Sequence, residues 1–394
     1  MTSIDLHGNW DTFNRVRLER LIAHVRDKGA ASYAVVDCDN TSLFGDVQDA
    51  TFFQQLGTLA FAMDPDELYS TLTKGVPGEP MGVNADGQPV TIKDLARDIH
   101  DDYVWLYGAY EGLGGTRSLD EVRAQARYKD FVAKMRYTYD ALCEAFEPMV
   151  GYQWIIYMFS GMTAEQVRRL TESAVRAQLR RPVRKLTWTS PAELEGCAGR
   201  IRVTFQDGLR TVPEMQRLYA SLRCVGVEVF MCSASFVDVV RELATNDAFG
   251  YGFDEEHVIA MELERDEAGR ILPEYRKGWV PTQRAGKSEN IRRLLVSRFG
   301  HGPILVAGDS DGDAWMLREF EDTRCGLIFN RVHGGAIGEL CARAVDARDD
   351  LDARYVLQGR DEHTGALLPC PHTVLHGAKR RVLLHDDGAR LEKV

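Results

Sequence analysis

The chain has 394 residues, which is more than one hydrophobic core usually holds, so we expect two domains. Its 59 acidic residues outnumber its 48 lysines and arginines, and the formal net charge of −11 argues against nucleic acid or an anionic membrane as a partner. The N-terminal sequence lacks the basic and apolar segments of an export signal, and no apolar run is long enough to span a membrane, so we expect a soluble, cytoplasmic protein. Composition does not indicate an oligomeric state.

The first motif is the segment from Asp37 to Thr41, Asp-Cys-Asp-Asn-Thr, which directly follows the apolar residues 33–36. Such a run predicts a buried strand, and ligands of open α/β sheets bind at the carboxyl ends of strands. Asp37 can attack phosphorus there, and Asp39 can protonate the leaving alkoxide and later deprotonate water. Thr41 can fix the turn through its side chain. The simpler alternative is an Asx-type turn that closes the strand.

The segment between this motif and the next is far longer than a crossover needs, so we expect residues 45–205 to form an inserted domain. Its pattern is mainly helical, because apolar residues recur at spacings of three and four through 46–63, 119–146 and 163–179. An insertion of this kind can cover a catalytic crevice, exclude water and select the leaving group.

Aromatic residues are frequent in this insertion, at Tyr103, Trp105, Tyr107, Tyr110, Tyr152, Trp154 and Tyr157. Aromatic faces attract quaternary ammonium groups, and an acidic neighbour such as Glu111 could add charge complementarity. The more common interpretation is that aromatic residues at helical spacing pack in a core. A basic run from Arg168 to Lys185 also has two interpretations: a solvated helix face, which is the commoner case, or a surface that steers anions.

The second motif lies in residues 226–236, where a helix-ending glycine precedes an apolar strand. Ser233 is expected at the tip of this strand, where its hydroxyl can donate to a phosphate oxygen. The N–H of Ala234 is expected to open a helix over 236–244, whose N-terminus attracts anions. Ser233 could instead simply cap that helix. Additional strands of the same sheet are predicted at 203–205 and 258–263.

The third motif centres on Lys287, which precedes an amphipathic helix running to about Phe299. A lysine there can neutralise both a phosphoryl group and the nucleophilic carboxylate. A lone lysine is otherwise usually solvated surface.

The fourth motif is the acidic stretch 308–313, Gly-Asp-Ser-Asp-Gly-Asp, which follows a predicted strand at 303–307. Several carboxylates in one crevice repel one another unless a cation is present, and a set of oxygen ligands suits Mg²⁺. A Ca²⁺-binding loop is the alternative. It is disfavoured because such a loop needs a later bidentate Glu and a helix on both sides, and here a strand comes first.

The eight cysteines contain no Cys-x-x-Cys pair, and we expect them to be reduced, small apolar residues. Cys370, His372 and His376 lie close together in the sequence. They lack the fourth ligand that a structural zinc site needs.

Together the four segments resemble, in the same order, the motifs of the haloacid dehalogenase superfamily in its phosphoserine-phosphatase-like branch. The resemblance implies an α/β fold with a doubly wound, Rossmann-like parallel sheet and a large, mainly helical cap inserted after the first strand motif. Residues 1–44 and 206–394 would form the core and residues 45–205 the cap. Asp37 would be the nucleophile that forms an aspartyl-phosphate, and Asp39 would be the general acid and base.

The same resemblance implies Ser233 and Lys287 as phosphate ligands. Mg²⁺ would be held by the Asp37 carboxylate, the main-chain carbonyl of Asp39 and Asp309. Asp313 would contact the metal directly or through water. Asp311 has no counterpart in the family that we can assign.

Residues 10–21, 213–215 and 358–365 look more similar to bacterial phosphorylcholine phosphatases than to phosphoserine phosphatases. Those phosphatases are usually exported, whereas this chain shows no export signal. The sequence therefore predicts a Mg²⁺-dependent phosphomonoesterase acting on a small, soluble phosphate ester, with phosphorylcholine weakly favoured. The alternatives are a phosphotransferase or mutase of the same superfamily, and a non-catalytic phosphate-binding module.

Overall fold

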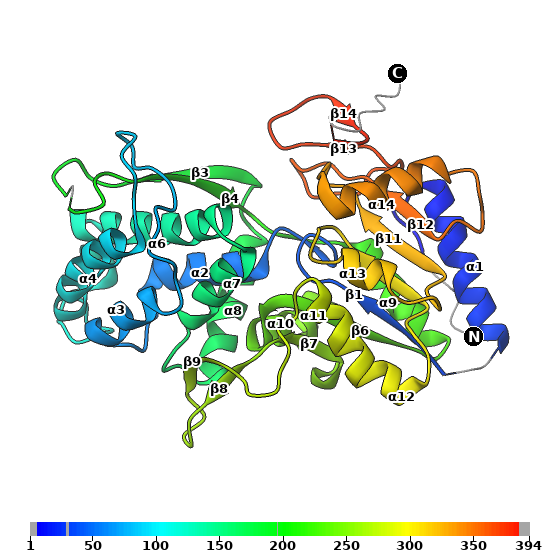
Figure 1. The fold of residues 1–394 in the computed structure, drawn as a ribbon, viewed down its shortest axis with the longest axis horizontal. Helices are drawn as coiled ribbons and strands as arrows, with labels where there is room; N and C mark the ends of the chain where they lie inside the picture. Colours follow the sequence, from blue (N-terminus) through cyan, green and yellow to red (C-terminus); the bar gives the residue numbers. More distant parts are fainter. Residues whose placement is uncertain (1–5, 29–30, 195, 386–394) are drawn as a thin grey trace.

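The structure, a computed structural model, describes residues 6–28, 31–194 and 196–385. Its centre is a sheet of six parallel strands in the order β12-β11-β10-β1-β6-β7 (Figure 1). The strands are Ser32–Val36 (β1), Val227–Phe236 (β6), Val258–Met261 (β7), Leu305–Gly308 (β10), Cys325–Phe329 (β11) and Tyr355–Gln358 (β12). Because later strands lie on both sides of β1, the sheet is doubly wound, which confirms the predicted fold class.

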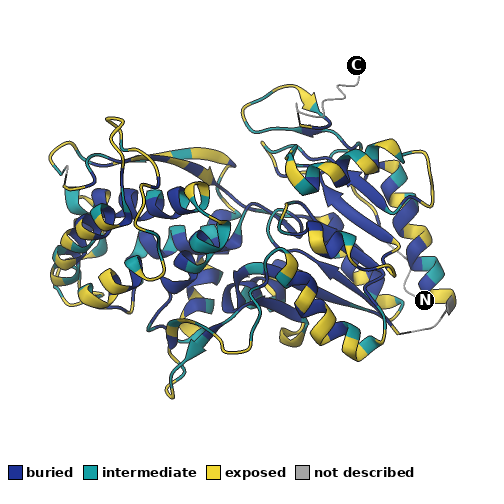
Figure 2. Cartoon of the chain, viewed as in Figure 1, coloured by how far each residue is buried: buried dark blue, intermediate teal, exposed yellow. Residues whose placement is uncertain are grey.

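Both faces of this sheet are covered, which explains why its strands are continuous apolar runs (Figure 2). Tyr33 and Val35 of β1 belong to a cluster on one face that includes Ile291. Ala34 and Val36 belong to a larger apolar cluster on the other face. The helices of this lobe are α1 (Thr12–Lys28), α9 (Pro213–Cys224), α10 (Val237–Thr245), α11 (Ala285–Ile291), α12 (Ser297–Phe299), α13 (Ala314–Arg318) and α14 (Gly335–Asp346).

The prediction that residues 203–205 add a strand to the central sheet is wrong. These residues belong to β4 (Arg202–Asp207), which pairs antiparallel with β3 (Arg184–Thr189) outside that sheet. Side chains of β4 alternate between exposed and buried positions, as expected of a strand with one face in solvent. The predicted strand at 258–263 does join the central sheet, as β7.

Most of the segment between β1 and β6 lies in a second lobe, at the left of Figure 1. We call this lobe, which contains the helices α2 to α8, the insert lobe. Its helices are α2 (Val47–Thr58), α3 (Pro65–Thr73), α4 (Ile92–Ala109), α5 (Leu119–Arg123), α6 (Ala126–Ala145), α7 (Pro148–Tyr157) and α8 (Ala164–Gln178). The helix predicted at 119–146 is therefore divided in two. The helix predicted at 46–63 ends at Thr58, because Leu59 adopts a left-handed conformation. No helix in the described ranges is long and apolar enough to cross a bilayer.

Two short strands carry the chain between the lobes. β2 (Leu43–Phe44) leads out of the sheet, β5 (Arg210–Thr211) leads back, and the two pair antiparallel. The lobes also pack against each other through α8 and α10, and one apolar cluster includes residues of both. The ring of Phe159 stacks on that of Phe236 at a centroid distance of 5.6 Å. We propose that residues 45–205 act as a cap on the core.

After β12 the chain forms a C-terminal arm, residues 359–384. Arg360 of this arm is fully buried, and its Nη2 donates to the main-chain oxygen of Asn40 at 2.6 Å. Its guanidinium lies 5.6 Å from the ring centroid of Phe44 and 4.9 Å from that of Phe329. The arm therefore supports the loop that follows β1. The remaining strand pairs are β8 (Leu263–Arg265) with β9 (Ile271–Tyr275), and β13 (Thr373–Val374) with β14 (Arg381–Val382).

The insert lobe buries a group of charged side chains between α4 and α6. Lys134 is fully buried, and its Nζ lies 3.0 Å from Asp98 Oδ2 and 2.7 Å from Asp130 Oδ2. Asp102 is also buried, with Arg127 Nη1 at 3.1 Å from its Oδ1. Burial raises the pKa of Asp102 to about 8, and the charge of Asp130 adds to this effect. Asp102 therefore binds a proton near neutral pH.

This pKa predicts that the free energy of unfolding falls as the pH rises. An unfolded aspartate ionises near pH 4, whereas folded Asp102 ionises at about 8, so its contribution is complete below about pH 4 and is lost as the pH rises through 8. Between pH 5 and pH 8.5, Asp102→Asn should therefore lose less of its melting temperature than wild type, by roughly several degrees, as followed by circular dichroism. Asp120→Asn, whose carboxylate is 94% exposed, is the control. Equal losses in all three proteins would contradict the prediction.

Candidate active site

Three carboxylates meet at the carboxyl end of the central sheet. Asp37 directly follows β1, and Asp309 directly follows β10, which pairs with β1 in parallel. Carboxylate oxygens of Asp37, Asp309 and Asp313 all lie within 4.8 Å of one another, and all three side chains are buried. The structure therefore brings the first and fourth motifs together in a space that one metal ion could share.

Lys287 connects two of these carboxylates. Its Nζ lies 2.6 Å from Asp37 Oδ1 and 2.6 Å from Asp313 Oδ1. Burial lowers the pKa of Lys287, but the charges of Asp313 and Asp37 outweigh burial and raise this pKa well above its usual value. Lys287 is therefore a cation beside the predicted nucleophile. It lies within the first turn of α11, and not before the helix as predicted.

Burial and neighbouring charges also shift the pKa of Asp37. Burial raises the pKa of Asp37 well above its usual value, the charges of Asp313 and Asp309 raise it further, and Lys287 opposes them. A nucleophilic carboxylate has to be ionised. The predicted role of Asp37 as a nucleophile would therefore require more positive charge nearby than Lys287 supplies.

Asp39 is held by groups from both lobes. The N–H of Val47, at the start of α2, donates to Asp39 Oδ1 at 2.6 Å, and Ser235 Oγ donates to Asp39 Oδ2 at 2.7 Å. Burial raises the pKa of Asp39 to about 6, and these two hydrogen bonds limit the rise. A carboxyl group that titrates near neutral pH can both donate and accept a proton.

The acidic loop after β10 is held by its own hydrogen bonds. Asp313 Oδ2 accepts from the N–H groups of Asp309 and Ser310, each at 3.1 Å, and from Ser310 Oγ at 3.0 Å. Asp311 Oδ1 accepts from the N–H of Ile337 at 2.8 Å, in the first turn of α14. Asp311 thus joins the loop to a neighbouring helix, which gives a structural role to a residue without an assigned counterpart.

Comparisons with known proteins find a phosphatase relative and a solved structure that is similar over almost the whole chain. No protein-family model matches the chain. The phosphorylcholine phosphatase of Pseudomonas aeruginosa is 27% identical over 212 residues, which are 45% of this chain and 54% of that protein, so the match spans about half of the relative. A crystal structure of a conserved protein of unknown function from Anaerococcus prevotii DSM 20548 is 33% identical, covers 95% of this chain and 99% of its own, and has a TM-score of 0.88.

The resemblance to the haloacid dehalogenase superfamily thus has support from a phosphatase relative that matches about half of this chain. The four motifs of the chain converge in one site of a doubly wound parallel sheet, as the sequence resemblance implied.

One cation at this site was not predicted from the sequence. Arg331 follows β11, the strand beside β10, and its Nη1 lies 2.9 Å from Asp309 Oδ2. The other oxygen, Asp309 Oδ1, accepts from Thr41 Oγ1 at 2.9 Å. Thr41 thus orients Asp309, whereas the sequence predicted that its side chain fixes the turn. Arg331 could have been found by applying the strand-end rule to the apolar residues 325–329.

The residues present fit a divalent cation. Within the described ranges, Asp37, Asp309 and Asp313 form a group of possible metal ligands. Together with Asp39, they place four carboxylates against the two cations, so full ionisation leaves excess negative charge. All donors are oxygens, which Mg²⁺ prefers. Both oxygens of Asp313 accept hydrogen bonds, and so do both oxygens of Asp309, so these contacts do not decide whether Asp313 would bind the metal directly or through water.

Ser233 does not lie at the end of its strand. β6 continues through Ala234 and Ser235 to Phe236, and α10 begins at Val237 without a side-chain cap. The prediction that the N–H of Ala234 opens this helix is therefore wrong, and so is the alternative that Ser233 caps it. Ser233 is fully buried, and its Oγ accepts from the N–H of Ser235 at 3.1 Å. Ala234 and Ser235 line the cavity, and phosphate binding by Ser233 and Ala234 stays a prediction.

The cavity over these residues has a volume of about 120 Å³, and both lobes line it. The insert lobe and its entry contribute Asp46, Gln48, Tyr139, Tyr152 and Ile155. Asp46 Oδ1 accepts from the N–H of Asp49 at 2.8 Å and so caps α2. Burial raises the pKa of Asp46 well above its usual value, and the charges of Asp39 and Asp49 raise it further. The side of the cavity away from the sheet is thus both aromatic and acidic.

Most of the predicted aromatic candidates do not line this cavity. Tyr152 does, but the six others are absent from its lining. Tyr103, Trp154 and Tyr157 are buried in the packing of the insert lobe. Core packing is therefore the better interpretation for most of the set. Tyr139 lines the cavity and was missed, because its place on α6 has the same periodicity as core residues.

The basic run at 168–185 has acidic partners on the surface. Arg169 pairs with Glu165 at 2.7 Å, and Arg176 pairs with Glu172 at 2.8 Å, both along α8. This pattern is typical of a solvated helix face. The cavity lining includes none of these basic residues, so the structure favours that interpretation over anion steering.

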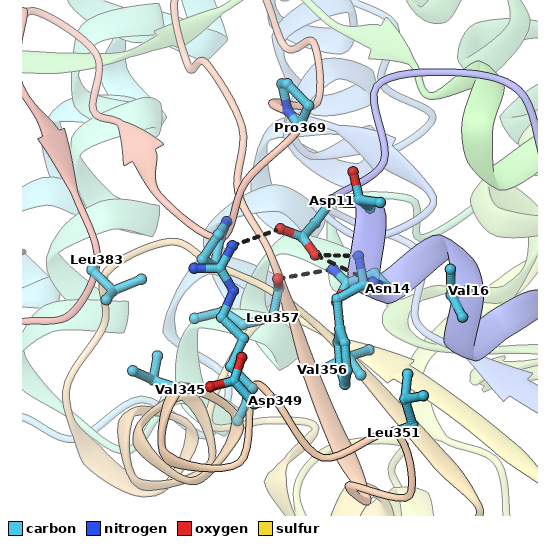
Figure 3. A pocket seen from close by; sticks show the side chains of 15 residues that line it. Asp11, Asn14, Val16, Val345, Asp349, Leu351, Val356, Leu357, Pro369 and Leu383 are labelled. Carbon is cyan, nitrogen blue, oxygen red and sulfur yellow. Dashed lines mark hydrogen bonds and ion pairs between the residues drawn. The ribbon is translucent and has the colours of Figure 1, made fainter.

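A larger cavity, of about 740 Å³, lies beside β12 at the start of α1 and the end of α14 (Figure 3). There Asp11 Oδ2 pairs with Arg348 at 3.2 Å, and Asp11 Oδ1 accepts from the N–H groups of Phe13 and Asn14. Asn14 Nδ2 donates to the main-chain oxygen of Leu357 at 2.9 Å. These polar groups join α1 to its neighbours, and the lining contains no residue of the four motifs. We therefore place the chemistry in the smaller cavity.

Proposed function

We propose that this protein is a Mg²⁺-dependent phosphomonoesterase that acts on a small, soluble phosphate ester through an aspartyl-phosphate. The contact of Lys287 with Asp37 and Asp313 carries the proposal, because it puts a fixed cation next to a buried carboxylate at the carboxyl end of a parallel sheet. Asp39, with its pKa of about 6, supplies an acid and base in the same cavity. The phosphorylcholine phosphatase relative supports the same chemistry.

In the first half-reaction, Asp37 attacks phosphorus while Asp39 gives its proton to the leaving oxygen, so one P–O bond forms as the ester bond breaks. In the second, Asp39 removes a proton from water, the water oxygen attacks phosphorus, and Asp37 is released together with inorganic phosphate. Lys287 stabilises the charge of the phosphoryl oxygens in both steps. Mg²⁺, held by Asp37, Asp309 and the main-chain oxygen of Asp39, would neutralise further charge when bound.

The walls of the cavity support a weak preference for phosphorylcholine. Tyr139 and Tyr152 offer aromatic rings and Asp46 offers a carboxylate on the side contributed by the insert lobe. Such a combination attracts a quaternary ammonium group. A cationic leaving group would also relieve the crowding of negative charge that raises the pKa of Asp46. In this proposal the insert lobe is the cap that selects the leaving group, and the cytoplasmic location stays a prediction.

A substrate panel tests this proposal. Phosphorylcholine, phosphoethanolamine, phosphoserine and sugar phosphates would be incubated with the protein and Mg²⁺, and released phosphate measured. We expect release that stops with EDTA and returns with Mg²⁺, with kcat/KM about tenfold higher for phosphorylcholine than for phosphoserine. Transfer of phosphate to added alcohols would instead indicate a phosphotransferase. Binding of phosphate without release from any ester would indicate the non-catalytic module.

A further inference from the structure

The guanidinium of Arg331 lies at the boundary between two cavities. Besides the active-site cavity, Arg331 lines a neighbouring one of about 220 Å³, and Asn40 and Asp46 line both. The Arg331 side chain is 29% exposed, although it is paired with the buried carboxylate of Asp309. Arg331 is therefore held by Asp309 and still partly accessible from the cavities that it lines.

Most hydrogen-bond donors of Arg331 are free for a ligand. A guanidinium has five N–H donors. Within the part of the chain that the structure describes, Arg331 donates one hydrogen bond to a protein acceptor, which is Asp309 Oδ2. Arg136 gives the contrast: its side chain is 6% exposed, and it donates to both Asp49 and Asp140. Arg136 thus has the contacts of a structural arginine, whereas Arg331 does not.

The position of Arg331 favours an anion close to the nucleophile. Asp309, which holds Arg331, has a carboxylate oxygen within 4.8 Å of one of Asp37. Lys287 reaches Asp37 from α11, so the two cations approach the same place from different elements. A phosphoryl group above Asp37 carries several oxygens, and a planar guanidinium can bind two of them at once.

We propose that Arg331 is a second phosphate-binding cation of this site, which binds non-bridging oxygens of the phosphoryl group together with Lys287. This inference rests on the proposed function. It makes Arg331 a residue that touches substrate, and it assigns to Asp309 the additional task of orienting the guanidinium.

Equilibrium titration with inorganic phosphate at saturating Mg²⁺ tests the inference without turnover. For Arg331→Met we expect the Kd of phosphate to rise at least about tenfold, with Arg331→Lys between this variant and wild type. Arg168→Met is the matched control, because Arg168 is 26% exposed and pairs with one carboxylate, that of Glu255 at 2.6 Å. The control should bind phosphate as wild type does. Thermal unfolding of each variant confirms that it is folded, and Arg331→Lys serves if Arg331→Met is not.

A separate titration with Mg²⁺ alone distinguishes phosphate binding from a purely structural role. If Arg331 only oriented Asp309, its replacement would change the Kd of Mg²⁺ and leave the Kd of phosphate at saturating Mg²⁺ unchanged. That result would overturn the inference, and so would a wild-type protein that binds no phosphate. If the variant weakens phosphate binding but wild type hydrolyses no ester, the inference stands and the proposed hydrolase activity fails. If wild type hydrolyses esters and both proteins bind phosphate equally, the hydrolase activity stands and the inference about Arg331 fails.

Discussion

Asp37→Asn is expected to release p-nitrophenol from p-nitrophenyl phosphate at least about 10⁴-fold more slowly than wild type, as for removal of a nucleophile in other enzymes. The amide has nearly the shape of the carboxylate and still offers one oxygen to Lys287 Nζ, which lies 2.6 Å from Asp37 Oδ1. It cannot form the acyl-phosphate bond, so the loss should be in chemistry and not in folding. Initial rates at saturating Mg²⁺, with contaminating phosphatase excluded, measure this effect.

Thermal unfolding of the same variant provides an independent check. Burial raises the pKa of Asp37, and the charges of Asp313 and Asp309 raise it further, so removing its charge should leave the melting temperature unchanged or raise it. Asp311→Asn is the control within the acidic loop, because Asp311 bonds to the N–H of Ile337 and does not line the cavity. It should keep activity near that of wild type. A wild-type rate for Asp37→Asn would show that another group is the nucleophile.

The sequence was most informative where strands are buried on both faces. The apolar runs before Asp37 and Asp309 are typical of covered parallel strands, and the ends of such strands are where ligands bind. Which strands are neighbours is a tertiary property that local patterns do not contain. The apolar run 325–329 could have placed Arg331 after a strand, but its position beside Asp309 follows only from the pairing of β11 with β10.

The insert lobe was predicted as helical, but its cavity-facing residues could not be identified. Tyr139 and Trp154 both lie on helices of the insert lobe, yet one lines the cavity and the other donates its Nε1–H to the main-chain oxygen of Leu72. The packing of α6 and α7 against their neighbours, which local sequence patterns do not contain, decides which ring reaches the cavity. Ser233 shows a related limit: β6 continues beyond it with irregular pairing to β7, so the strand end was placed too early.

The second large effect is expected for Asp39→Asn. An alkoxide leaves slowly without a proton, whereas p-nitrophenolate leaves readily. The kcat/KM of this variant should therefore fall by about 10²- to 10⁴-fold for an alkyl phosphate such as phosphorylcholine, and much less for p-nitrophenyl phosphate. Because Asp39 also activates water, the phosphoenzyme should accumulate. A burst of p-nitrophenol equal to the enzyme concentration, followed by a slow steady state, would reveal it.

The pH dependence of kcat/KM tests whether Asp39 acts as the general acid. Burial raises the pKa of Asp39 to about 6, while its hydrogen bonds from Val47 and Ser235 limit the rise. The acid form is therefore lost as the pH rises through 6, and the wild-type kcat/KM for an alkyl phosphate should fall about tenfold per pH unit above that value. In Asp39→Asn this limb should be absent. Equal losses for alkyl and p-nitrophenyl esters, or an unchanged limb in the variant, would mean that Asp39 orients the cavity without transferring the proton.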